Sequence, residues 1–152
     1  MSDIETLRTV VLDGQCDGMG HLNTQHYMAL FDLASQYLAY HVLGHGVARQ
    51  RETSLGWADA AHEIDYRREV LAGAPVLVLS RILRVGTTSF SYEHRLVLAG
   101  APDDVCARMT ATTVQFDLTA RRACPLLPDV RARAERHCPP ASTGRKEETD
   151  VR

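Results

Sequence analysis

The chain has 152 residues, the usual length of one domain built around a single hydrophobic core. It is 45% hydrophobic and 24% charged, with a formal net charge of -2, and this balance offers no basic surface that would attract a nucleic acid. The N-terminal sequence lacks the basic start and apolar run of a signal peptide, and no apolar stretch approaches the roughly 20 residues that cross a bilayer. We therefore expect a cytoplasmic protein with no membrane partner.

The first part of the chain predicts one strand followed by one long helix. Leu7–Leu12 is rich in apolar and β-branched residues and stops at the turn pair Asp13-Gly14. From Gln25 to Leu43 there is no Gly or Pro, and apolar residues recur at spacings of three and four. This pattern predicts an amphipathic helix of about five turns. We expect Asn23 to cap its first turn and Gly44 to follow its last.

The second part of the chain changes to the two-residue alternation of antiparallel strands. After a polar run at Arg49–Glu52, which we interpret as a connecting loop, four strands are predicted. They lie at about Ala61–Val70, Val76–Val85, Phe90–Leu98 and Val105–Leu118, with turn signals between them such as the one at residues 100–104. In the third of these strands, apolar residues and His94 are expected on the buried face and Glu93 on the other. Leu126–Arg136 predicts a short further helix.

A strand, a long helix and a series of antiparallel strands define an α+β domain, in which the sheet must cover the apolar face of a single helix. No internal repeat and no second domain is visible in the sequence. We assign residues 1–137 to this domain. Residues 138–152 are polar, charged and rich in Pro, Ser, Thr and Gly, and we predict a disordered tail there.

The cysteines do not show the spacing of a metal site, and the histidines offer only one weak candidate pair. The four cysteines are far apart, and their density is not that of a secreted disulfide scaffold, so we expect reduced thiols. His41 and His45 have the i, i+4 spacing of a helical ligand pair, but Gly44 is expected to end the helix between them and no third ligand is evident. The sequence predicts no metal and no cofactor.

The loop before the helix carries the residues with the most chemistry. Asp17, His21 and Asn23 place a carboxylate, an imidazole and an amide within seven positions, just ahead of a helix N-terminus. Such a terminus presents unpaired amides and a positive partial charge, so it can keep a carboxylate ionised and can stabilise a developing oxyanion. Thioester hydrolysis needs both functions. From spacing alone, the alternative that Asp17 closes a turn and Asn23 caps the helix stays open.

A resemblance to a known family is carried by this loop and by the segments after it. The string Cys16-Asp17-Gly18-Met19-Gly20-His21-Leu22-Asn23-Thr24-Gln25-His26-Tyr27, followed by Leu30-Phe31-Asp32, resembles the signature of the 4-hydroxybenzoyl-CoA thioesterase family. Weaker motifs continue the resemblance at Ile64–Val70 with Gly73, Val85-Gly86 with Ser89, and Phe116–Leu118 with Arg121-Arg122 and the segment Pro125–Pro128. Together they cover about Leu7–Arg133, which is most of the chain.

The resemblance implies a hotdog fold, in which an antiparallel sheet wraps around the long helix. It also implies that two subunits join their sheets and form active sites at their interface, so we expect a homodimer or a homotetramer. The implied activity is hydrolysis of an acyl-CoA to the free acid and CoA. Asp17 matches the catalytic Asp of the family, which acts as nucleophile through a mixed anhydride or as general base on water; both routes stay open.

The resemblance also suggests roles for neighbouring residues. The backbone amide of Thr24 matches the family's oxyanion donor at the helix start. His21 is a candidate to orient Asp17, to bind water or to protonate the leaving thiolate, and the alternative is that it only stabilises the loop. The candidate substrate-binding residues are Asn23, Tyr27, Met28, Trp57, His62, Thr87 and Thr88.

One departure from the family concerns the nucleotide part of the substrate. Some members carry basic residues just before the position of Ser89, where this chain has Gly86-Thr87-Thr88. Other candidates for phosphate contacts are Arg67, Arg68, Arg81 and Arg84, although charged residues on strand faces are usually only solvated. Two alternatives to acyl-CoA hydrolysis therefore stay open, namely a thioesterase acting on acyl carrier protein and a non-catalytic acyl-CoA-binding protein of the same fold.

Overall fold

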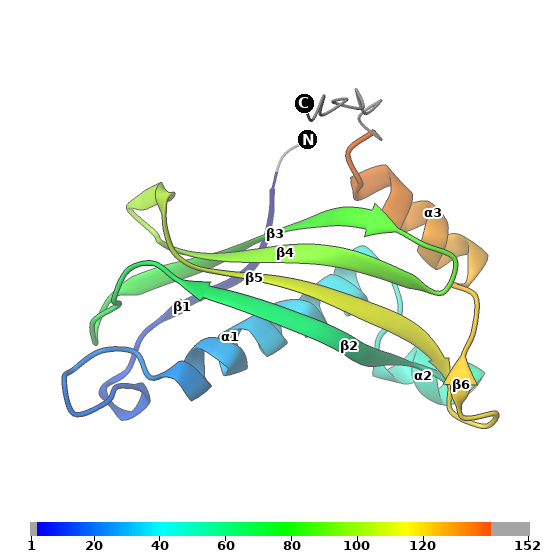
Figure 1. The fold of residues 1–152 in the computed structure, drawn as a ribbon, viewed down its shortest axis with the longest axis horizontal. Coiled ribbons are helices and arrows are strands. Elements are labelled where there is room, and N and C mark those ends of the chain that lie inside the picture. The colour runs from blue at the N-terminus through cyan, green and yellow to red at the C-terminus, as the bar shows by residue number, and fades with distance from the viewer. Residues whose placement is uncertain (1–2, 141–152) are drawn as a thin grey trace, which may run out of the picture.

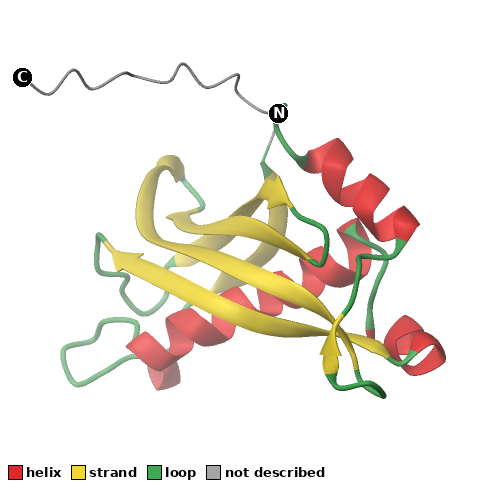
Figure 2. Cartoon of the chain, turned by 45° about the vertical axis from the view of Figure 1, so that its right-hand side comes forward, coloured by secondary structure: helices red, strands yellow, loops and turns green. Residues whose placement is uncertain are grey.

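The structure is a computed structural model that describes residues 3–140. Its main feature is a six-stranded antiparallel sheet that curves around one long helix (Figures 1 and 2). The strands are β1 (Ile4–Val10), β2 (Leu55–Tyr66), β3 (Pro75–Val85), β4 (Ser89–Leu98), β5 (Ala101–Asp117) and β6 (Arg122–Ala123). Their order is β1-β3-β4-β5-β2, with β6 paired to the end of β5. This is the α+β hotdog architecture that the sequence predicts.

The long helix forms where its sequence pattern predicts it. Helix α1 spans Thr24–Tyr37 and continues into a π-helical turn at Leu38–Val42. The Asn23 side chain accepts a hydrogen bond from the amide of Gln25 at 3.1 Å, which confirms the predicted cap. Gly44 has a φ of 68°, the left-handed conformation expected just past a helix. The apolar face of α1 packs against the sheet at the centre of the core through Tyr27, Leu30, Phe31 and Ala34.

The polar run predicted as a loop is instead a short helix, α2 (Val47–Thr53). The prediction was wrong because it rested on the lack of an apolar stripe, whereas this helix is stabilised by contacts at its ends. The guanidinium of Arg49 donates to both carboxylate oxygens of Asp129 in α3 (Pro128–His137), at 2.5 and 2.6 Å. Ser54 adopts a left-handed conformation and ends the helix. A contact with a residue so distant in sequence cannot be inferred from local polarity.

Two strands extend further than predicted because they pair with each other. β2 begins at Leu55 rather than near Ala61 and ends at Tyr66 rather than at Val70. β5 begins at Ala101, inside the predicted turn. The two strands are paired along the whole length of β2, so backbone hydrogen bonds favour the strand even where the alternation is weak. β1 lies slightly earlier than predicted, and α3 agrees with the predicted short helix.

The inner face of β4 is buried as predicted, but Glu93 on its outer face is buried as well, with 3% of its surface exposed. Arginines from three strands surround it. Arg81 Nη2 lies 2.9 Å from Glu93 Oε1, and nitrogens of Arg95 and Arg108 lie 3.4 and 3.7 Å from the same carboxylate group. Burial of a carboxylate is tolerated when cations pair with it in this way.

The molecule has two distinct ends along α1 (Figure 1). One end holds the β1–α1 loop, the N-terminus of α1 and the segment between β2 and β3, and the other holds the β3–β4 turn with α2 and α3. Arg131 of α3 donates to the carbonyl oxygens of Gly86 and Thr87 in that turn, at 2.5 and 3.0 Å. Within residues 3–140 no helix is long and apolar enough to cross a membrane. The predicted tail falls mostly on residues 141–152, outside the described part of the chain, and stays a prediction.

Candidate active site

The loop between β1 and α1 holds the Asp17 carboxylate in a fixed position. Asp17 Oδ1 accepts hydrogen bonds from the backbone amides of Met19 at 2.9 Å and His21 at 3.2 Å. The amide of Asp17 donates to the His21 carbonyl at 2.8 Å, and Gly20 takes a left-handed φ of 78° in this tight turn. Asp17 Oδ2 has no hydrogen-bond partner among the described residues. The carboxylate thus closes a turn with one oxygen and leaves the other free for chemistry.

The N-terminus of α1 offers an unpaired backbone donor. The Asn23 carbonyl accepts the amides of His26 and Tyr27 at 2.9 and 3.2 Å, and its side chain accepts the amide of Gln25. The Thr24 amide, by contrast, has no acceptor within residues 3–140. Unpaired amides of a first turn carry the positive end of the helix dipole. This amide can therefore bind a carbonyl oxygen that gains negative charge.

Asp17 and Thr24 line one open cavity of about 380 Å³, which we call the Asp17 cavity. Four of the predicted site residues meet there, namely Asp17, His21, Thr24 and Tyr27. The opposite wall comes from the end of β2 and the residues after it, and it contributes Tyr66, Arg67, Arg68 and Glu69. The cavity therefore combines two carboxylates, Asp17 and Glu69, with a set of hydrogen-bond donors and cations.

The imidazole of His21 is paired with Glu69 rather than with Asp17. His21 Nε2 lies 2.9 Å from Glu69 Oε2, and 27% of the His21 side chain is exposed. The pairing follows from a backbone contact, because His21 forms an isolated bridge with Leu71 and the Leu22 amide donates to the Val70 carbonyl at 2.8 Å. Sequence reasoning assigned no role to Glu69, although it lies in one of the motifs that resemble the family. Only the bridge shows that its side chain faces the loop.

Tyr27 and Tyr66 lie side by side in the lining of the Asp17 cavity. Their rings meet edge to face, with centroids 5.1 Å apart. The Tyr27 hydroxyl donates to the Arg68 carbonyl at 3.5 Å, and burial raises the pKa of this phenol to about 12. Tyr27 is therefore a neutral donor at physiological pH. Arg68 is held by an ion pair with Asp104 of β5, so its guanidinium is fixed at the rim.

Other predicted residues lie outside this cavity in the single chain. Asn23 is the helix cap, and Met28 packs against the core. Trp57 donates from Nε1 to the His45 carbonyl at 3.2 Å and lines a second, smaller cavity. His62 lies on the same strand as Trp57, β2, and pairs with a carboxylate of that strand. Their part in substrate binding stays a prediction.

Thr87 and Thr88 are in the β3–β4 turn, at the opposite end of the sheet from Asp17 (Figure 1). Their carbonyls accept the backbone amides of Leu126 at 3.0 Å and Gln115 at 2.7 Å. Within one chain the structure does not bring this turn to Asp17, so the role of both threonines also stays a prediction. His45, considered above as a metal ligand, is buried against Trp57, and residues 3–140 contain no group of three or more possible metal ligands.

A family comparison assigns the chain to a superfamily. The sequence profile of the Thioesterase-like superfamily matches residues 11–134, and the chain belongs to this superfamily. The matched span contains the Asp17 loop, α1 and all the strands that pair in the sheet apart from β1. A search of curated proteins finds no match.

Solved structures show the same fold. A protein from Staphylococcus aureus, solved in complex with CoA, has a TM-score of 0.82 at 11% identity, with 100% of this chain and 97% of that chain covered. A putative thioesterase from Pseudomonas putida has a TM-score of 0.76 at 22% identity, again with 100% and 97% covered. A 1,4-dihydroxy-2-naphthoyl-CoA thioesterase from Synechocystis has a TM-score of 0.75 at 16% identity, with 86% and 94% covered. At these identities the likeness confirms the hotdog fold and leaves the substrate open.

Proposed function

We propose that the protein is a thioester hydrolase that converts an acyl-CoA into the free acid and CoA, with Asp17 as its catalytic carboxylate. One observation carries the proposal: the Asp17 carboxylate is fixed through Oδ1, keeps Oδ2 free, and shares an open cavity with the unpaired amide of Thr24. We also propose that, within its superfamily, the chain belongs with the 4-hydroxybenzoyl-CoA thioesterase-like members and acts in the cytoplasm.

The two available routes use the same atoms. In the first, Asp17 Oδ2 adds to the thioester carbon, the C–S bond breaks, CoA leaves as the thiolate, and water hydrolyses the mixed anhydride. In the second, Asp17 takes a proton from the water that attacks the thioester carbon. In both, the carbonyl oxygen becomes an oxyanion, and the Thr24 amide stabilises it more strongly than it stabilises the ground-state carbonyl.

In this proposal His21 serves the leaving group. Its ring reaches the Asp17 cavity, and its Nε2 lies 2.9 Å from Glu69 Oε2, so Glu69 fixes the orientation of the ring. A protonated imidazole can donate to the departing thiolate or to the water of the second step. Glu69 is a positioning residue in this scheme, because it acts through His21.

A second copy of the chain completes the proposed site. β2 is the edge strand of the sheet, and among the described residues its outer edge has no partner. An unpaired edge of this length is a template for strand pairing. We propose that two copies join through β2, as a homodimer or as half of a homotetramer. Trp57 and His62 both lie on β2, so this pairing puts them at the junction between subunits.

Arg67 and Arg68 suit the phosphate of the substrate carrier. Both line the Asp17 cavity, and Arg67 is half exposed. A phosphopantetheine arm carries phosphate whether it ends in the nucleotide of CoA or in a carrier protein, so the same cations fit either carrier. The test therefore includes one acyl group presented on both carriers.

The deciding experiment is release of free thiol from short, medium, long and aromatic acyl-CoAs, with the protein's own cysteines subtracted. Asp17→Asn keeps the turn, because the amide oxygen still accepts from Met19 and His21, and it removes the charge. We expect turnover to fall by about 10²–10⁴-fold. Asp13→Asn, in the same loop, is the matched control and leaves turnover unchanged. Near-normal turnover in Asp17→Asn excludes Asp17, and a wild-type protein that is inactive on both carriers excludes the hydrolase.

A further inference from the structure

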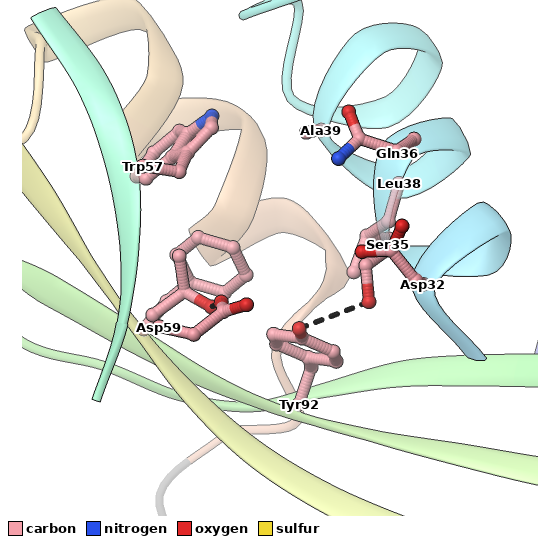
Figure 3. Close-up of a pocket in the computed structure, with 10 residues that line it drawn as sticks. Asp32, Ser35, Gln36, Leu38, Ala39, Trp57, Asp59 and Tyr92 are labelled. Carbon is pink, nitrogen blue, oxygen red and sulfur yellow. Dashed lines mark hydrogen bonds between the residues drawn. The ribbon is translucent and has the colours of Figure 1, made fainter. Parts of the chain in front are cut away.

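Trp57, the sole tryptophan, lies in the wall of the smaller cavity, on the side opposite α1 (Figure 3). Its indole Nε1 donates to the backbone carbonyl of His45 at 3.2 Å, and the two rings meet edge to face with centroids 5.2 Å apart. His45 belongs to residues 43–46, which connect the π-helical turn at the end of α1 to α2. Trp57 is therefore held by a buried histidine that the proposed chemistry does not use.

The hydrogen bonds of Gln115 fix which nitrogen of the His45 ring carries the proton. The backbone amide of Leu127 donates to Gln115 Oε1 at 3.3 Å, so the NH2 group of Gln115 faces the other way, where its nitrogen lies 3.4 Å from His45 Nε2. An NH2 group only donates, so His45 Nε2 accepts and the single proton of the neutral ring is on Nδ1. Nδ1 is buried and has no hydrogen-bond partner within residues 3–140.

A second proton on this ring meets no acceptor. It binds to Nε2, and the NH2 group of Gln115 opposite is itself a donor. Gln115 cannot turn its oxygen toward the ring without leaving the Leu127 amide unpaired. Only 1% of His45 is exposed, so water does not solvate the added charge. A buried imidazolium with two unpaired donors is strongly disfavoured, and the charged ring is stable only if it moves out to solvent.

The charged groups around residues 43–46 do not compensate a charge on His45. Among the described residues, Asp129 of α3 is the carboxylate whose charge acts on the ring, and it already binds two guanidinium nitrogens of Arg49. Burial has the largest effect on His45 and lowers its pKa; Arg49 also lowers the pKa, whereas Asp129 raises it. The other titratable side chains beside this segment are Arg133, which packs on Gly44, and Tyr40, which packs on Gly46.

We propose that His45 is a positioning residue, which holds Trp57 in the cavity wall while its ring is neutral and releases Trp57 when acid protonates the ring. The carbonyl that accepts from Trp57 belongs to His45 itself, so a ring that moves out to solvent takes this acceptor with it. Gly44 and Gly46 flank His45 and allow the backbone rotation that the movement requires. Because Trp57 is one of the predicted substrate-binding residues, the consequence for catalysis rests on the proposed function, whereas the movement does not.

The fluorescence emission maximum of Trp57 reports the movement in the full-length protein. As the pH falls from about 7.5 to about 4.5, we expect a reversible shift to longer wavelength, because the indole leaves an apolar wall for water. The midpoint should lie below the pKa of 6.5 of an ordinary imidazole, since burial lowers the pKa of His45. Circular dichroism of the same samples checks that the helices and the sheet persist. An emission shift that coincides with loss of the circular dichroism signal is unfolding and overturns the proposal.

Two variants separate the His45 ring from other titrating groups. His45→Gln keeps an acceptor toward Gln115 and cannot be protonated, so the emission shift should disappear. Gln115→Glu keeps the oxygen that the Leu127 amide needs and offers a carboxylate to the protonated ring, so Trp57 should stay in place at low pH. His62→Gln is the matched control, because it removes a histidine from the strand that carries Trp57 and should leave the shift unchanged. An absent shift in the wild type, or an unchanged shift in both His45→Gln and Gln115→Glu, overturns the proposal.

Hydrolysis of one acyl-CoA carries the inference to substrate binding. Between about pH 7.5 and about pH 5 the KM of the wild type should rise about fivefold, the factor that corresponds to one neutral hydrogen bond, and Gln115→Glu should not show this rise. Both proteins have the same Asp17 cavity, so comparing them removes any effect of pH on that cavity. An equal rise of KM in both proteins overturns the effect on substrate binding. A protein that shows the emission shift but hydrolyses no thioester contradicts the proposed function and leaves the His45 movement established.

Discussion

Two cavities of this protein contain carboxylates in different surroundings. In the Asp17 cavity the carboxylate of Asp17 faces donors, because backbone amides, arginines and an imidazole paired with Glu69 line the remaining walls. In the smaller cavity, which Trp57 and Tyr92 line, the exposed carboxylates of Asp32 and Asp59 lie instead beside aromatic rings, hydroxyl groups and the amide of Gln36. A carboxylate alone therefore says little about function. The hydrogen bonds around it decide whether the site favours developing negative charge.

The largest effect is expected when the Asp17 cavity loses one hydrogen-bond donor, the backbone N–H of Thr24. Thr24→Pro removes the backbone N–H that we assign to the oxyanion. Thr24 is the first residue of α1, where proline is well tolerated, and Asn23 before it has the extended ψ of 146° that a following proline requires. We expect the fold to persist and kcat to fall by about 10²–10³-fold, the usual result of losing one oxyanion donor.

The control for this variant is Thr24→Ala, which keeps the amide and changes only the side chain. Its kcat should remain within about twofold of the wild type if the backbone is the donor. Circular dichroism and urea unfolding of both variants check that the helix is intact. A proline variant that is folded and fully active would exclude the Thr24 amide from catalysis.

A smaller effect is expected from the buried ring of His94 on β4. His94 has a folded-state pKa of about 3 against 6.5 for an ordinary imidazole, chiefly because it is buried. Between these values the unfolded chain binds more protons than the folded chain, so the free energy of unfolding falls as the pH falls. The slope is at most about 1.4 kcal/mol for each pH unit. The pKa of His45, also lowered by burial, adds to the loss with the same sign.

Urea unfolding at several values between about pH 4.5 and pH 7 measures this slope. In His94→Gln the slope should become shallower, because the titrating group is gone while the amide can still contact Ser35 and Ser80. Asp129, whose pKa is lowered to about 2 by its hydrogen bonds from Arg49, affects stability only at lower pH. Identical slopes in the variant and the wild type would show that His94 is protonated in the folded protein or is not the group that titrates.

The elements with a regular hydrophobic period could be predicted from the sequence. α1, β3 and β4 have one strongly apolar face each, and that pattern reports burial directly, whereas α3 is indicated by Pro128 near its first turn. α2 was missed because its stability comes from Arg49 and Asp129, which are distant in sequence. Glu93 was expected on an exposed face for a similar reason, since only the folded sheet brings three arginines to it. Local pattern predicts which residues face inward, and it does not predict which distant charges meet.

The candidate site shows the same limit. Asp17, His21 and Thr24 are contiguous in one loop, so a single sequence motif suffices to predict that they act together. Glu69 and the second cavity depend on contacts between segments that no local pattern reports. Ser35 and His94, for example, are 59 positions apart and meet at 2.9 Å only because α1 lies across β4.

The smallest expected effect concerns Glu69, the second carboxylate in the lining of the Asp17 cavity. Glu69→Ala removes the partner of His21, whose ring is then free to turn away from the leaving group. We expect kcat to fall about tenfold with little change in KM, because general acid catalysis is weakened while substrate binding is not. Glu69→Gln keeps an acceptor oxygen and should restore most of the lost kcat if orientation is what matters. Glu63→Ala, an exposed residue of β2, is the matched control. A purely structural role for Glu69 would instead lower the free energy of unfolding and leave kcat and KM of the folded enzyme unchanged.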